Sequence, residues 1–101
     1  MQMVMMVFRT SLESEVLPLV EQQEMPFTRL DSTQGKGTTG PVSGSSLTVS
    51  GTNTVLLLAV PDERLTPFRE RVHQFQDGLQ AHAKSGSVPF HIFVLPCIQW
   101  F

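Results

Sequence analysis

Two unbroken apolar runs of strand length constrain the fold of this chain most strongly. Residues 3–8 read MVMMVF and residues 54–60 read TVLLLAV. A run without polar alternation is typical of a strand buried on both faces or lying in the middle of a sheet. We therefore expect both segments to be central strands. The chain has 101 residues, enough for one domain whose own core stabilises it without a metal or a disulfide.

Helical spacing of apolar residues predicts a helix after the first run. Its apolar face consists of Leu12, Val16, Leu19 and Val20. Thr10 and Glu13 read as a capping box at its start, and the pattern continues to about Gln23. Pro18 lies well inside this helix and lacks a backbone N–H, so we expect a kink or a distorted turn there.

A second helix is predicted after the second run. Its apolar face consists of Leu65, Phe68, Val72, Phe75 and Leu79. Thr66 is expected to be the N-cap, with Pro67 at the first helical position, where a missing N–H costs nothing. Gly78 is expected to mark the end of this helix.

Two further strands complete the pattern. Residues 27–34, FTRLDSTQ, alternate weakly and are rich in threonine and charge, which suits an edge strand with one wet face. Residues 90–96, FHIFVLP, predict a last strand closed by Pro96. The order strand, helix, strand, strand, helix, strand predicts an α+β fold of the ferredoxin-like type. In it two helices cover one face of a four-stranded antiparallel sheet, with the first and third strands in the centre and the second at an edge.

The last strand and the residues after it are too apolar for a bare edge. Association between subunits is the simplest cover for such a strand. Trp100 and Phe101 are large aromatic residues of a kind that is rarely left in water. We therefore expect this tail to pack on a neighbouring subunit or on the sheet.

The segment between the second and third strands is long and rich in glycine. Residues 34–53 hold five of the seven glycines of the chain. A loop of this length in a small domain is usually a functional loop or a disordered segment, because ordering it costs entropy with little burial in return. Its GKGTTG string is not a phosphate-binding P-loop, since strand-like residues rather than a helix follow it.

Charge and cysteine content exclude several classes of partner and compartment. The net charge of −2 gives the chain no electrostatic reason to approach nucleic acid or an anionic membrane. Cys97 is the single cysteine, so no internal disulfide forms. The first residues lack the pattern of a signal peptide, and no apolar stretch is long enough for a membrane helix. We expect a cytoplasmic protein.

Two sets of side chains raise the question of metal binding or catalysis. Imidazole and thiolate are the usual ligands of zinc and copper, but the spacing of the candidates matches no compact motif. These candidates are His73, His82, His91 and Cys97. Four carboxylates fall around the first helix and its end, where solvated side chains are the ordinary finding. They are Glu13, Glu15, Glu21 and Glu24. We expect neither a metal site nor an enzyme.

Several strings together resemble a short, divergent branch of the P-II-like superfamily. They are GKGTTGP followed by a glycine and GTNTVLLLAV, the opening MVMMVF and the late FVLP. The resemblance follows the order of elements over nearly the whole chain. It implies a ferredoxin-like subunit that assembles into a trimer. It also implies clefts between subunits that bind an adenine nucleotide, and a loop at residues 35–53 that signals to a regulated protein or a membrane transporter.

The resemblance also implies which residues bind the ligand. They are Gly35, Lys36, Gly37, Thr38, Thr39, Gly40 and Gly51, with Lys84 and Gly86 as loose counterparts of the family's GDGKIF stretch. The physical chemistry agrees, because glycines let backbone N–H groups approach an anion, a lysine adds a point charge and threonine hydroxyls donate further hydrogen bonds.

The chain departs from the familiar nitrogen regulators in three respects. It has no tyrosine for nucleotidylation, no complete GDGKIF stretch, and no basic residues after the last strand, where it reads CIQWF. The effector is therefore open: ATP, ADP, AMP, another small anion, or none. Divalent-cation tolerance proteins share the trimeric architecture, so the alternative function is that of a divalent-metal-binding regulatory trimer.

Overall fold

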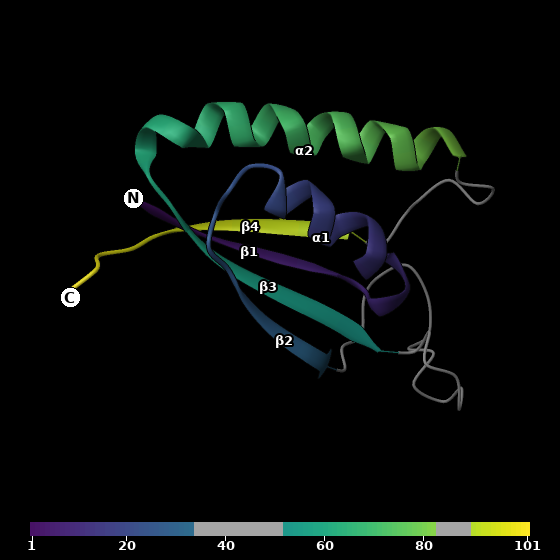
Figure 1. The fold of residues 1–101 in the computed structure, drawn as a ribbon, viewed down its shortest axis with the longest axis horizontal. Coiled ribbons are helices and arrows are strands. Elements are labelled where there is room, and N and C mark those ends of the chain that lie inside the picture. Colours follow the sequence, from purple (N-terminus) through teal and green to yellow (C-terminus); the bar gives the residue numbers. More distant parts are fainter. Residues whose placement is uncertain (34–51, 83–89) are drawn as a thin grey trace.

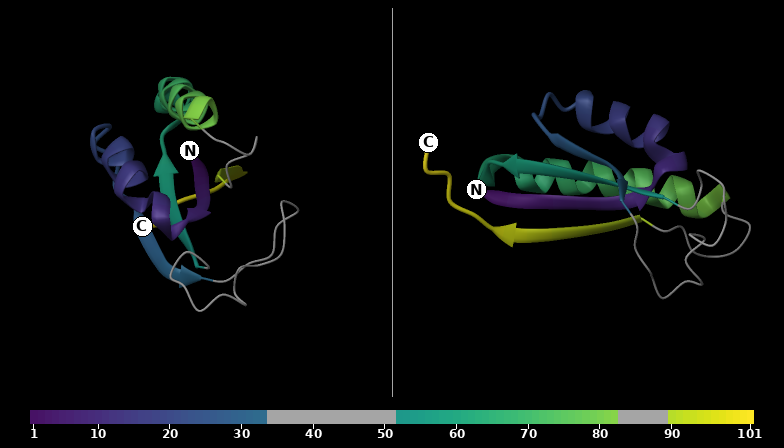
Figure 2. Two further views of the ribbon diagram at one scale, coloured as in Figure 1. Left: turned by 90° about the vertical axis from the view of Figure 1, so that its right-hand side faces the viewer. Right: turned by 90° about the horizontal axis from the view of Figure 1, so that it is seen from below.

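The computed structural model describes residues 1–33, 52–82 and 90–101. Its elements are β1 (Gln2–Arg9), the 3-10 turn η1 (Thr10–Leu12), α1 (Glu13–Glu21), β2 (Thr28–Thr33), β3 (Asn53–Val60), α2 (Asp62–His82) and β4 (Phe90–Pro96). The strands form one antiparallel sheet in the order β2-β3-β1-β4, and both helices cover the same face (Figures 1 and 2). The predicted ferredoxin-like arrangement is confirmed, with β1 and β3 in the centre and β2 at an edge.

The core lies between the helices and one face of the sheet. Alternate residues of β1 and β3 point into it and are almost fully buried: Val4, Met6, Phe8, Thr54, Leu56, Leu58 and Val60. The helices contribute Val16, Val20, Phe68 and Val72. The apolar pattern of both helices, as predicted from the sequence, therefore covers the helical face of the sheet.

The opposite face of the sheet is also apolar, but the described residues leave it uncovered. Cross-strand register sets Met5 between Leu57 and Phe93, and Val7 beside Val55. We call this surface the open face; its apolar members are Met3, Met5, Val7, Leu30, Val55, Leu57, Ala59, Phe93 and Leu95. The two apolar runs thus lie in the middle of the sheet, yet the described residues bury only one of their faces.

The start of the first helix differs from the predicted capping box. Thr10 lies in η1, and α1 begins after Leu12 without a capping side chain. The Thr10 hydroxyl instead lies 2.9 Å from the Thr52 hydroxyl, and Glu13 pairs with Arg29 at 2.7 Å. The predicted capping box is wrong because the side chains of Thr10 and Glu13 interact with Thr52 and Arg29, which are distant in sequence.

The end of the first helix also differs by two residues from the prediction. α1 ends at Glu21 rather than Gln23, and a turn leads to Glu24, whose φ of 56° lies in the left-handed region. Such a residue commonly follows the end of a helix, where glycine is the usual choice. Pro18 lies inside α1, and its carbonyl accepts a hydrogen bond from the Gln22 N–H at 2.9 Å.

Both predicted ends of the second helix are wrong. α2 begins at Asp62, so Thr66 is not the N-cap and Pro67 lies within the helix. Asp62 and Glu63 favour the earlier start, because carboxylates in the first turn interact well with the helix dipole. Gly78 does not end the helix, which continues to His82; packing of Phe75 and Leu79 against the core offsets the glycine.

A Gly78→Ala variant is therefore expected to be more stable than the wild type. A Cβ at this position meets no atom within 4 Å, so the methyl group fits without strain. We expect the free energy of unfolding to rise by about 0.5–1 kcal/mol, mainly because alanine restricts the unfolded chain. Urea denaturation measures this. Gln80→Ala, at an exposed site on the same helix, is the control and should change stability by only a few tenths of a kcal/mol. A loss of stability in Gly78→Ala would contradict the helical assignment here.

Candidate functional site

The ligand-binding residues implied by the resemblance lie outside the described residues. They are Gly35, Lys36, Gly37, Thr38, Thr39, Gly40, Gly51, Lys84 and Gly86. The structure does describe where the two segments that carry them join the fold. The first leaves the sheet at Thr33, the end of β2, and returns to β3 at Asn53, which is the register partner of Thr33.

The second of these segments rejoins the fold at the same end of the sheet. Residues 83–89 precede Phe90, the first residue of β4, and Phe90 is the register partner of Phe8. Phe8 in turn pairs with Thr54, one residue from Asn53. The described flanks of the loop and of the Lys84 segment therefore meet at one end of the sheet (Figure 1).

Three threonines fix the return of the loop to the sheet. The Thr10 N–H donates to the Thr52 carbonyl at 3.0 Å, and their hydroxyls lie 2.9 Å apart. The hydroxyl of the fully buried Thr54 donates to the Thr10 hydroxyl at 3.1 Å. This threonine cluster joins the start of β3 to the end of β1 by hydrogen bonds, immediately next to the 34–51 segment.

Arg29, the cation on β2, is already paired with carboxylates. Arg29 lies 2.7 Å from Glu13 and 2.6 Å from Asp31. The hydrogen bond to Asp31, supported by the charges of both carboxylates, raises the pKa of Arg29 above its ordinary value. Arg29 therefore ties β2 to α1 and is not available to an anion. The other carboxylates that the sequence singled out, Glu15, Glu21 and Glu24, are exposed.

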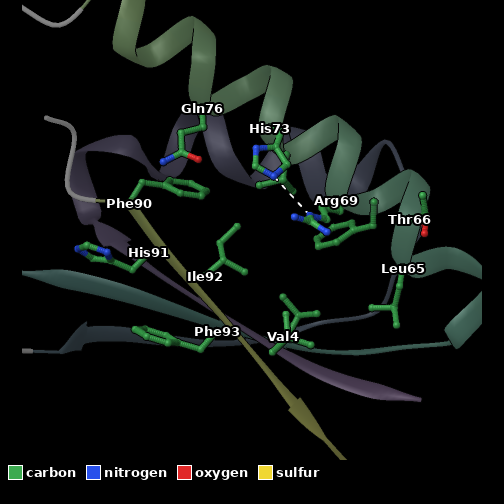
Figure 3. A pocket seen from close by; sticks show the side chains of 13 residues that line it. Val4, Leu65, Thr66, Arg69, His73, Gln76, Phe90, His91, Ile92 and Phe93 are labelled. Carbon is green, nitrogen blue, oxygen red and sulfur yellow. Dashed lines mark hydrogen bonds between the residues drawn. The ribbon is translucent and has the colours of Figure 1, made fainter. Parts of the chain in front are cut away.

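A separate groove of about 580 Å³ lies between α2 and β4 (Figure 3). Its floor is apolar, with Phe68, Val72, Phe90 and Ile92. Its rim on α2 is polar and consists of Arg69, His73 and Gln76, which lie above Ile92 in Figure 3. Arg69 Nε donates to His73 Nε2 at 3.5 Å, and no carboxylate of the described residues pairs with Arg69.

This groove was not predicted from the sequence. The signal was present, because Arg69, His73 and Gln76 recur at helical spacing beside the apolar face of α2. That spacing alone, however, is typical of a solvated helix flank. This flank of α2 lines a groove because β4, the strand beside it, lies at the edge of the sheet.

The histidines and the cysteine do not come together as a metal site in the described part of the chain. No group of three or more histidine, cysteine, aspartate or glutamate side chains there could hold an ion. His73 and His91 both line the groove, from α2 and β4 respectively. The His82 side chain lies outside the described residues. Within the described residues, neither helix combines the length and apolarity that a membrane crossing requires.

This chain is similar in fold to several solved structures, at low sequence identity. No protein-family model and no curated sequence matches it. The fold is similar to CPII from Thiomonas intermedia K12, a nitrogen regulatory PII-like protein solved with ADP, AMP and bicarbonate. The TM-score is 0.67 at 20% identity, over 92% of this chain and 81% of CPII.

Two further solved structures show the same fold. TTHA0516 from Thermus thermophilus, named as a PII-like signalling protein, matches with a TM-score of 0.60 at 18% identity over 92% of this chain and 82% of that one. A functionally unknown protein from Pediococcus pentosaceus matches with a TM-score of 0.66 at 16% identity over 99% and 94%. At these identities the comparisons show the fold, which is that of PII-like proteins.

Proposed function

We propose that this chain is a divergent P-II-like regulatory protein of the cytoplasm. It binds a small anionic effector, an adenine nucleotide or another anion, and signals through the loop at residues 35–53. The single observation that carries this proposal is the meeting of Thr33, Asn53 and Phe90 at one end of the sheet. Both segments with glycine and lysine residues join the sheet at that end. CPII, whose fold is similar, was solved with ADP, AMP and bicarbonate.

The proposed mechanism is a change in the state of the loop. Backbone N–H groups around Gly35–Gly40 and the Lys36 ammonium pair with the anionic group of the effector. Thr38 and Thr39 add hydroxyl donors, and Lys84 and Gly86 approach from the second segment. The threonine cluster holds the base of the loop, so binding stabilises one arrangement of the segment beyond it, and a regulated protein or a membrane transporter recognises that arrangement. No catalytic step is proposed.

The proposed assembly is a homotrimer formed through the open face. In a single chain, Phe93 and Leu95 on this face are about half exposed, at 54% and 48%. Contiguous apolar surface of this kind marks interaction sites in soluble proteins. A second copy offers the same apolar chemistry, and the clefts between subunits then supply the place where the effector binds.

A thermal-shift experiment tests the effector. The purified protein is heated with ATP, ADP, AMP, cyclic AMP, bicarbonate or divalent metals. A ligand that binds only the folded state at one hundred times its Kd adds about 2.7 kcal/mol of stability. We expect an anionic effector to raise Tm, and Lys36→Ala to abolish most of the rise.

The control is Arg71→Ala, which removes one positive charge from an exposed site on α2 and should keep the full shift. A nucleotide shift that Lys36→Ala leaves unchanged would place the ligand elsewhere. Shifts with metals alone would favour the metal-binding alternative. No shift with any compound would contradict an effector of these classes and leave a loop that binds only a partner protein.

A further inference from the structure

The groove between α2 and β4 runs beside a free strand edge. Among the described residues β4 pairs with β1 alone, so the backbone groups on its other side have no strand partner there. An extended segment can add to such an edge by backbone hydrogen bonds and place alternate side chains in the adjacent groove. Val94, at 53% exposure, and the half-buried Ile92 and Leu65 offer the apolar contact surface.

The segment at residues 97–101 has the side chains that fit such a groove. It reads CIQWF and follows β4 away from the sheet (Figures 1 and 2). In an extended conformation Ile98 and Trp100 point to the same side. They are 84% and 86% exposed, so two large apolar side chains of this segment lie in water within the single chain.

The segment cannot place Trp100 in the groove of its own chain by turning back along β4. β4 stays paired with β1 as far as Pro96, the partner of Gln2. Even the shortest hairpin turn, of two residues, would set Trp100 opposite Leu95. That position lies past the strand residues that line the groove, which end at Val94, and it faces the open face instead. A second copy has no such restriction.

We propose that the 97–101 segment of a second copy lies along the free edge of β4 and inserts Ile98 and Trp100 into this groove. Trp100 packs beneath Arg69, whose guanidinium group has no carboxylate partner among the described residues. The electron-rich face of the indole ring attracts a guanidinium group, and the apolar body of the ring covers Ile92 and Val94.

The contact is head-to-tail, because the segment of one subunit meets the groove of the next. Contacts of this kind form rings when the rotation between subunits closes, and a trimer is one such ring. The inference therefore rests on the proposed homotrimer, to which it adds a defined contact between subunits.

Trp100 is the only tryptophan, so its fluorescence reports on this contact directly. In the assembled wild-type protein we expect emission at short wavelength and weak quenching by acrylamide. Dilution to monomers should shift the emission to longer wavelength. Val94→Glu should raise the acrylamide quenching constant several-fold at a concentration where the wild type is assembled, and Arg69→Ala should raise it less. Arg71→Ala is the matched control and should have no effect, because Arg71 contacts Gln22 rather than the groove.

Size-exclusion chromatography with light scattering, and circular dichroism to verify folding, accompany each measurement. A wild-type trimer whose Trp100 is readily quenched overturns the inference and leaves the trimer intact. So does a trimer in which neither Val94→Glu nor Arg69→Ala increases quenching. A Trp100 that stays protected in diluted monomers overturns the docking on a second copy. A wild-type protein that is monomeric at every concentration overturns both the trimer and this inference.

Discussion

A Met5→Lys variant is expected to convert the proposed trimer into folded monomers. Met5 lies near the centre of the open face, between Leu57 and Phe93 in the cross-strand register. Association through this face would bury the lysine charge in an apolar contact without a partner. An unpaired buried charge costs several kcal/mol, which is comparable to the net affinity of many subunit contacts. The helical face and its core stay unchanged, so the subunit itself should fold.

Light scattering after size-exclusion chromatography measures the mass, and circular dichroism verifies the fold. The control is Ala81→Lys, which adds the same charge at an exposed position of α2 and should keep the wild-type mass. Met5→Lys at the full assembled mass would show that the open face is not the interface. A wild-type protein that is already monomeric would contradict the proposed trimer itself.

The fold could be predicted from sequence because its determinants are local and repeated. The apolar runs around Met5 and Leu57 indicated central strands, and the polar 27–34 segment indicated an edge. The structure confirms both. The spacing of Phe68, Val72 and Phe75 depends only on helix geometry, so the apolar face of α2 was also correct.

The errors arose where a partner distant in sequence decided the outcome. Thr10 and Glu13 have the spacing of a capping box, but Thr10 is hydrogen-bonded within the threonine cluster and Glu13 forms an ion pair with Arg29. Pro67 and Gly78 carry the usual signals of a helix start and end, yet packing against the core and the acidic first turn extend α2 beyond both. Residue patterns within one short segment carry no information on contacts with residues distant in sequence.

The candidate site also has one part that was predicted from the sequence and one part that required the structure. The glycines and lysines of the two segments were identified by resemblance, and they stay predictions because they lie outside the described residues. The structure adds that the flanks of both segments meet at one end of the sheet. They do so because Phe8 pairs with both Thr54 and Phe90. The groove under Arg69 could not be predicted without the strand order, because the groove is accessible only if β4 lies at the edge of the sheet.

A Phe90→Ala variant is expected to lose a large part of the stability of the subunit. Phe90 is 4% exposed, and its ring centroid lies 6.0 Å from that of Phe8 and 5.7 Å from that of Phe75. Its ring therefore connects β4 to both β1 and α2 within the core. Removing a buried phenylalanine costs about 3–5 kcal/mol, a large part of the roughly 5–15 kcal/mol of a typical domain.

Urea denaturation in the Met5→Lys background measures this loss without a contribution from subunit association. The matched control is Phe93→Ala, the same substitution on the same strand, at a side chain that is 54% exposed on the open face. It should lower the free energy of unfolding by about 1 kcal/mol or less, because little buried area is lost. Equal losses in the two variants would contradict a core on one face of β4 only, and would require the open face to be covered within the single chain.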